Sequence, residues 1–296
     1  MRPRVWWDAL TPVERLRVLV LGGGAGVLLL FVIFLVWAAP DGRLTSAEGA
    51  HCAQGRAPAA AVLILLDYTD ALSPSQVRAV KQEVNRVLED ARASELVSIA
   101  AIRNLPVEFK ISLCSPDPGG TPSVWHQLSH PYENWILIRA NWQQAFEVPM
   151  LAAERQLTLN CVAPRSPILQ SIDDATDQLG GAWRKAGQRR LVIFSDMMEN
   201  TDKFSHYGKQ NVLQNYESVA SRVDYVRRTH PALRGAEVSV YYLLIPGDVP
   251  YQDGYSREAH QRFWKDYFAQ NGANRISFTD LAFGPSSREV ANVRHC

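Results

Sequence analysis

The sequence lacks the short motifs that mark several large classes of enzymes and metal proteins. It contains no P-loop, no G-x-S-x-G nucleophile motif and no HExxH zinc motif, and its four cysteines form no CxxC pair. Its charge is nearly balanced, with a formal net charge of +1 over 296 residues. A general nucleic-acid binder usually carries a clear excess of positive charge, so this balance argues against nucleic-acid binding. The chain also shows no internal repeat.

One long stretch carries no charge at all. Residues 18–39 read VLVLGGGAGVLLLFVIFLVWAA, which at ~1.5 Å per residue is long enough to cross a bilayer core of about 30 Å. Arginines are concentrated before this stretch, so the positive-inside rule places residues 1–17 in the cytoplasm and the rest of the chain in the periplasm or outside the cell. A cleaved signal peptide is the alternative, although its apolar region is typically only ~7–15 residues long. We therefore expect a single-pass membrane protein.

Residues 40–58 are rich in Gly, Ala, Ser and Pro and are interpreted as a linker, and residues 59–296 alternate between strand and helix patterns. Strands are expected at 61–66, 191–194 and 238–245, and residues 61–66 form the continuous apolar run typical of a strand buried on both faces. A hairpin is expected at 95–115, and a last short strand at 275–278. Helices are expected at 73–93, 133–157, 167–179, 210–228, 256–270 and 286–293. This order predicts one α/β domain with a doubly wound, mostly parallel sheet and helices on both faces.

Two of the apolar runs end at an aspartate, in AVLILLD at Asp67 and in LVIFSD at Asp196. The carboxyl ends of parallel strands lie along one edge of the sheet, where ligands bind, so we expect both carboxylates there. Ser166 precedes a proline at the start of a helix and offers a hydroxyl oxygen. Oxygen donors of these kinds suit a hard cation such as Mg²⁺. Each residue also has a purely structural explanation, the aspartates as turn caps and the serine as a helix N-cap.

The order of these residues resembles the metal-ion-dependent adhesion site of von Willebrand factor A (VWA) domains. The family pattern is D-x-S-x-S, then a threonine in a T-P-L-type turn, then an aspartate in a T-D-G-type turn. Asp67 and Thr69 match the first two positions, Ser166 matches the threonine, and Asp196 matches the last aspartate. The resemblance covers residues 59–296 and includes the hairpin, which fits the family's antiparallel edge strand.

The chain departs from the VWA pattern at two positions. Ala71 stands where the family has a hydroxyl, and Met197 replaces the glycine after the last aspartate. Asp70, Ser73 and Glu199 are nearby oxygen donors that could take the place of the missing hydroxyl. With those departures noted, the resemblance implies a Mg²⁺ site whose coordination is completed by an acidic side chain of a protein partner.

The resulting hypothesis is a membrane-tethered binding or scaffold module without enzymatic activity, acting outside the cytoplasm. The loop that follows the second aspartate, NTDKFSHYG, should lie on the same edge of the sheet, where loops carry function. We therefore expect partner contacts from Asp70, Phe204, His206 and Tyr207. A metal-dependent, phosphoesterase-like hydrolase is one alternative, since paired carboxylates can hold a catalytic cation. A metal-free structural domain is the other.

The four cysteines form an even set, which in an exported domain favours disulfides, with buried free thiols as the alternative. Cys52 precedes the first strand, and Cys296 follows a last helix that should return to the same edge of the sheet. We therefore expect a Cys52–Cys296 bond, which leaves Cys114 to pair with Cys161.

Overall fold

The computed structural model describes residues 11–13, 52, 57–69, 72–103, 105–118, 134–157, 161–207, 215–227, 230–243, 257–281 and 294–295. The chain divides into two compact units, residues 1–45 with 126–133, and residues 46–125 with 134–296. Only residues 11–13 are described in the first unit, so the fold below is that of the second. No helix among the described residues is long and apolar enough to cross a membrane. The anchor expected at 18–39 and the helix expected at 286–293 lie outside the described residues.

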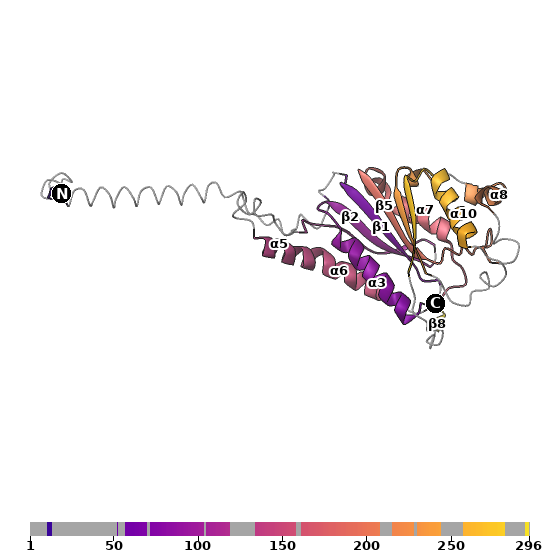
Figure 1. The fold of residues 1–296 in the computed structure, drawn as a ribbon, viewed down its shortest axis with the longest axis horizontal. Helices are drawn as coiled ribbons and strands as arrows, with labels where there is room; N and C mark the ends of the chain where they lie inside the picture. Colours follow the sequence, from indigo (N-terminus) through magenta and orange to yellow (C-terminus); the bar gives the residue numbers. More distant parts are fainter. Residues whose placement is uncertain are drawn as a thin grey trace. The chain divides into compact units, whose positions relative to one another are not determined.

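A six-stranded sheet forms the centre of the second unit (Figure 1). Its strands lie in the order β3-β2-β1-β5-β6-β7, and only the β2–β3 pair is antiparallel. The strands are β1 Ala60–Asp67, β2 Glu95–Ile102, β3 Glu108–Cys114, β5 Gln188–Ser195, β6 Glu237–Tyr242 and β7 Arg275–Asp280. The mostly parallel sheet and its hairpin, both predicted from sequence, are confirmed. We call the end at which the parallel strands begin the starting edge, and the opposite end the carboxyl edge.

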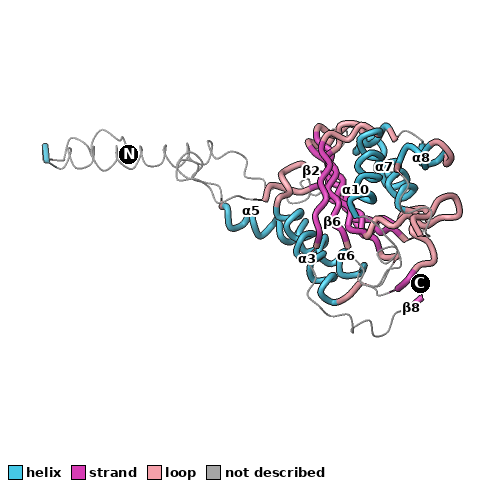
Figure 2. Tube along the Cα trace, turned by 45° about the vertical axis from the view of Figure 1, so that its right-hand side comes forward, coloured by secondary structure: helices cyan, strands magenta, loops and turns pink. Residues whose placement is uncertain are grey.

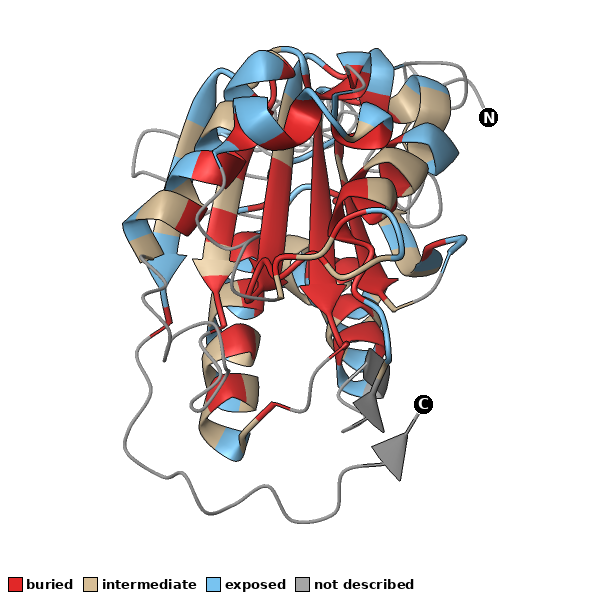
Figure 3. Cartoon of the chain, turned by 90° about the vertical axis from the view of Figure 1, so that its right-hand side faces the viewer, coloured by how far each residue is buried: buried red, intermediate tan, exposed pale blue. Residues whose placement is uncertain are grey.

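Helices cover both faces of the sheet (Figure 2). One face carries α3 Pro74–Glu89 and the consecutive segments α5 Trp135–Trp142, η2 Gln143–Glu147 and α6 Val148–Leu157. The other carries α7 Ile168–Arg184, α8 Tyr216–Ala220, α9 Asp224–Arg227, η3 Pro231–Leu233 and α10 Arg257–Gln270. Alternate residues of β1 belong to the two separate cores: Ile64 packs in the α3 core and Leu63 in the α7 core. The central strands are therefore buried on both faces (Figure 3), which explains their continuous apolar runs.

One local prediction is confirmed at an element boundary, and two elements differ from expectation. The predicted capping box is present at α3, where Ser73 Oγ accepts from the Gln76 N–H and the Gln76 side chain accepts from the Ser73 N–H. The helix expected at 210–228 is instead two short helices, α8 and α9, within its described part. A small parallel pair, β4 Cys161–Val162 with β8 Arg294–His295, was not predicted.

A disulfide joins Cys52 to Cys114, whose Cα atoms lie 5.3 Å apart. Both predicted pairings, Cys52–Cys296 and Cys114–Cys161, are therefore wrong. The reason is the direction of β3, which runs antiparallel to β2 and so brings Cys114 back to the starting edge, where Cys52 precedes β1. Cys296 and the side chain of Cys161 lie outside the described residues.

Candidate functional site

Asp67 is the last residue of β1, and its side chain is buried at the carboxyl edge. Its Oδ1 accepts hydrogen bonds from the Thr69 backbone N–H at 3.0 Å and from the Thr69 hydroxyl at 2.7 Å, so it caps its own turn. Its Oδ2 accepts from the Ser195 hydroxyl at 2.6 Å and from the Ser166 hydroxyl at 3.4 Å. One carboxylate thus collects donors from its own turn and from two distant segments. We call Asp67, Thr69, Ser166 and Ser195 the acid–hydroxyl cluster.

The strand register explains why Ser195 reaches this carboxylate. Leu66 of β1 lies opposite Phe194 of β5, so the next residue of each strand falls side by side at the carboxyl edge. Ser195 was not among the residues predicted for this site. A signal for it was present, because this serine directly precedes Asp196 at the end of an apolar strand. Backbone hydrogen bonds hold the third segment in place. Ser166 and Asn200 exchange two of them, at 3.0 and 2.9 Å.

The cluster's hydrogen bonds act on the ionisation of its carboxyl. Burial raises the pKa of Asp67 above its ordinary value, and the hydrogen bonds from Ser195, Thr69 and Ser166 oppose that rise. The carboxylate is therefore electrostatically costly in its present surroundings, in spite of four donors. A cation placed against it would favour its ionised form.

Asp196 directly follows Ser195 and is buried at the same edge. Its Oδ1 accepts from the Met198 backbone N–H at 2.9 Å, which makes the turn cap expected as its structural explanation. Of the four residues in the predicted metal set, hydrogen bonds join Asp67, Thr69 and Ser166 directly. Asp196 adjoins this group through its neighbour in sequence.

Met197 stands where the VWA pattern has a glycine, and its backbone keeps the conformation that favours glycine. Its φ is 61°, in the left-handed region that bulky residues rarely adopt. Its N–H donates to Ser195 Oγ at 2.7 Å, and its carbonyl accepts from the Trp264 indole N–H at 2.9 Å. The buried side chain packs in the α7 core. Packing and two hydrogen bonds therefore hold a turn that the sequence alone appeared to disfavour.

The start of α7 is capped from another segment. Its N-cap residue is Pro167, which has no side-chain cap, and the structural explanation of Ser166 as the N-cap is therefore wrong. Glu199 takes that role, because its Oε2 accepts from the Leu169 N–H at 2.9 Å. Its Oε1 accepts from the Tyr225 hydroxyl at 3.0 Å. Burial raises the pKa of Glu199 to about 8. With Glu199 at the cap, the Ser166 hydroxyl faces the cluster.

The residues expected to contact a partner differ in how far they are buried. Phe204 and His206 are 8% and 2% exposed and pack against the α10 aromatics, for example Phe263, so their assignment as surface contacts is wrong. His206 Nδ1 accepts from the Glu199 N–H at 3.1 Å, and burial lowers the pKa of this histidine. Tyr207 is half-buried and stays a prediction. Asp70 lies outside the described residues.

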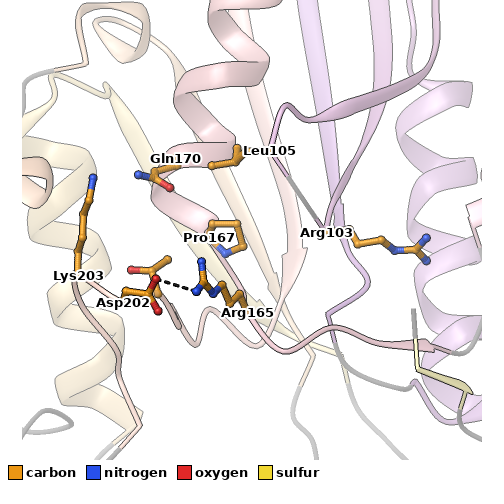
Figure 4. Close-up of a pocket in the computed structure, with 8 residues that line it drawn as sticks. Arg103, Leu105, Arg165, Pro167, Gln170, Asp202 and Lys203 are labelled. Atoms are coloured by element: carbon orange, nitrogen blue, oxygen red, sulfur yellow. Dashed lines mark ion pairs between the residues drawn. The ribbon is translucent and has the colours of Figure 1, made fainter.

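A pocket of about 490 Å³ adjoins the cluster, since Arg165 and Pro167 on either side of Ser166 both line it. Its lining residues are Arg103, Leu105, Arg165, Pro167, Gln170, Thr201, Asp202 and Lys203. Figure 4 shows Arg165 directed at Asp202, with which it forms a 2.7 Å ion pair, while Arg103 points away from the others. The pocket thus places cationic and polar side chains next to the segment that carries Ser166.

The VWA resemblance implies a Mg²⁺ ion held by the predicted metal set. Among the described residues, no three or more His, Cys, Asp or Glu side chains are grouped to hold a metal ion. The predicted set instead combines the carboxylates of Asp67 and Asp196 with the hydroxyls of Thr69 and Ser166, and such oxygen donors suit Mg²⁺. These residues fit the ion in kind. Binding would require both hydroxyls to turn their protons away from Asp67.

No family model matches this sequence, and no curated protein matches it. Among solved structures, the chain is similar to the SpRpn10 VWA domain, at 12% identity over 76% of this chain and 89% of that one, with a TM-score of 0.40. It is also similar to the ArnB paralog VWA2 from Sulfolobus acidocaldarius, at 11% identity over 75% of this chain and 41% of that one, with a TM-score of 0.37. The TFIIH p34 N-terminal domain is a third, at 13% identity over 76% and 92%, with a TM-score of 0.32. We base no assignment on likenesses of this size.

Proposed function

We propose that this protein is a membrane-tethered, protein-binding module of VWA type that uses a Mg²⁺ site at the carboxyl edge of its sheet. One observation carries the proposal. The Asp67 carboxylate collects hydroxyl groups from the segments after β1, before α7 and at the end of β5, at the edge where open α/β sheets bind ligands. Asp67, Thr69, Ser166 and Asp196 would hold the cation.

The surroundings of the cluster favour an acidic partner. Mg²⁺ retains exchangeable positions when proteins supply only part of its coordination shell, and a carboxylate from a partner suits such a position. The neighbouring pocket provides space for the partner's side chain. Arg165 is paired with Asp202, so Lys203 is the lining cation that favours the approach of negative charge, and it contributes to specificity and association rate. The role that fits this arrangement is an adaptor or scaffold, not an enzyme.

The tether is the second part of the proposal. Residues 18–39 are the membrane anchor, with residues 1–17 in the cytoplasm and the domain in the periplasm or outside the cell. The uncharged stretch and the arginines before it support this orientation. An exported location also agrees with the disulfide between Cys52 and Cys114, since disulfides persist in oxidising compartments.

Magnesium titration of the purified full-length chain in detergent tests the metal site. At a Mg²⁺ concentration 100 times the Kd, binding stabilises the folded state by about 2.7 kcal/mol, so the melting temperature should rise by several degrees. Asp196→Ala should remove this gain and should also weaken Mg²⁺-dependent binding to acidic peptides on an array. Phe278→Leu, a change on β7 remote from the cluster, is the control and should keep the gain.

The two alternatives give different results in the same experiment. Hydrolysis of a model phosphoester upon addition of Mg²⁺ or Mn²⁺ would favour the hydrolase. Absence of any thermal gain at millimolar Mg²⁺ would favour a metal-free structural domain. In that case Ala71→Ser, which restores the family's hydroxyl, should be tested next, since rescued binding would identify one missing ligand as the cause.

A further inference from the structure

The first turn of α5 presents large apolar side chains to solvent. Trp135, Ile136 and Leu137 are 46%, 60% and 50% exposed. They are consecutive, so they surround the end of the helix instead of forming one buried stripe. Arg139, one turn further on, places its guanidinium 4.2 Å from the centre of the Trp142 ring. The end of α5 thus combines an apolar tip with a cation behind it.

The other end of α5 is attached to the starting edge of the sheet. The Trp142 indole N–H donates to Ser115 Oγ at 3.0 Å. Ser115 follows Cys114, which is bonded to Cys52. The C-terminal end of α5 therefore lies near the place where the N-terminal segment joins the domain, and in Figure 1 the helix projects beyond the sheet. Its apolar tip lies about 10 Å from Trp142, at 1.5 Å per residue.

We propose that this apolar tip of α5 inserts into the interfacial region of the membrane that holds the chain. The inference rests on the tether in the proposed function. Residues 40–51, between the expected anchor and Cys52, reach at most roughly 40 Å when extended, so Cys52 at the starting edge stays within that distance of the anchor. Tryptophan and aliphatic side chains favour the boundary between headgroups and acyl chains.

This contact orients the binding site. The acid–hydroxyl cluster lies at the carboxyl edge, and an eight-residue strand separates the two edges by about 25 Å. With the starting edge held at the bilayer by both the linker and α5, the carboxyl edge faces away from the membrane. The cluster and its pocket are then presented to a partner in the surrounding compartment.

Site-specific photocrosslinking tests the contact in the full-length chain. The photoreactive residue benzoylphenylalanine replaces Ile136 in one variant and Val148 in another. Val148 is the matched control, because it is 59% exposed on the same helical segment but about 20 Å further along it. Both proteins are reconstituted into vesicles of phosphatidylcholine and phosphatidylglycerol, irradiated and analysed by mass spectrometry. A melting temperature equal to that of the wild-type chain shows that each variant is folded.

We expect lipid adducts at position 136 at about ten times the yield at position 148, because only the tip reaches the interface. Equal yields, or adducts of the chain with a second copy of itself at position 136, would overturn the inference while leaving the tether intact. Alkaline carbonate extraction separates the two proposals. A chain that is released from the vesicles by carbonate has no membrane anchor, and both the tether and the α5 contact would then be rejected.

Discussion

The Ser195 hydroxyl donates a 2.6 Å hydrogen bond to the Asp67 carboxylate across 128 residues of sequence. The bond joins the ends of two neighbouring parallel strands and helps to satisfy a buried acid. Ser195 Oγ also accepts from the Met197 N–H, so one hydroxyl connects the carboxylate to the left-handed turn that follows β5.

Ser195→Ala should lower the free energy of unfolding by about 2–4 kcal/mol, because it leaves a buried carboxylate and a buried N–H each without one partner. It should also raise the pKa of Asp67 further, since Ser195 is the strongest of the hydrogen bonds that lower it. Urea unfolding and carboxyl titration by NMR measure the two effects. Ser171→Ala is the control, because this buried α7 hydroxyl has no hydrogen-bond partner among the described residues. Its change should stay within about 0.5 kcal/mol, and equal losses would contradict the role given to Ser195.

The left-handed turn at Met197 predicts an inverted preference between two small residues. Both Met197→Ala and Met197→Gly lose a buried side chain, but only alanine keeps the strain of a Cβ at φ 61°. The glycine variant should therefore be the more stable of the two by about 0.5–1 kcal/mol in urea unfolding. The same pair at Met198, which is buried but not at positive φ, should show alanine as the more stable. If the same residue, alanine or glycine, is the more stable at both positions, the result would contradict backbone strain at Met197.

Glu199 makes the stability of the domain depend on pH. Its pKa rises from 4.5 to about 8 on folding, so the folded state holds this proton more tightly than the unfolded state. Its stabilising contribution is complete below pH about 4.5 and is lost as the pH rises to about 8. Glu199→Gln keeps an oxygen for the Leu169 N–H but cannot ionise. The wild-type chain should therefore lose about 1–4 kcal/mol relative to this variant between pH 5 and 8.

The comparison with Glu199→Gln removes the contribution of the buried histidines. Burial lowers the pKa of His260 to about 3 and that of His206 well below its ordinary value. These groups therefore reduce stability as the pH falls below about 6.5, in both proteins alike. A wild-type-minus-variant difference that does not change with pH would show that Glu199 is ionised throughout this range.

The disulfide between Cys52 and Cys114 predicts a specific cross-linked peptide and a loss of stability on its removal. It closes a separation of 62 residues, for which the chain-entropy model gives about 4 kcal/mol. Non-reducing peptide mapping should recover the Cys52–Cys114 peptide. Cys52→Ser and the double variant with Cys114→Ser should be destabilised to a similar extent. A peptide linking Cys52 to Cys296 would instead restore the pairing first expected from sequence.

Several features of this protein could be predicted because they depend on local or periodic properties of the chain. Runs such as residues 61–66 are continuously apolar because helices cover both faces of the strand, and this pattern needs no knowledge of which helices do so. The capping box at Ser73 is equally local. The position of Asp67 at the carboxyl edge follows from strand direction alone.

The sequence by itself therefore determined the α/β class, the hairpin and two acids at strand ends, because hydrophobic period and strand direction are properties of short segments. Only the tertiary structure decided which groups meet at those acids. Ser195 reaches Asp67 through the register of two strands, and Glu199 displaces Ser166 as the cap of α7 from a different loop. The pairing of Cys52 with Cys114 likewise depends on where an antiparallel strand returns. Contacts between distant segments follow from packing and register, which residue spacing does not contain.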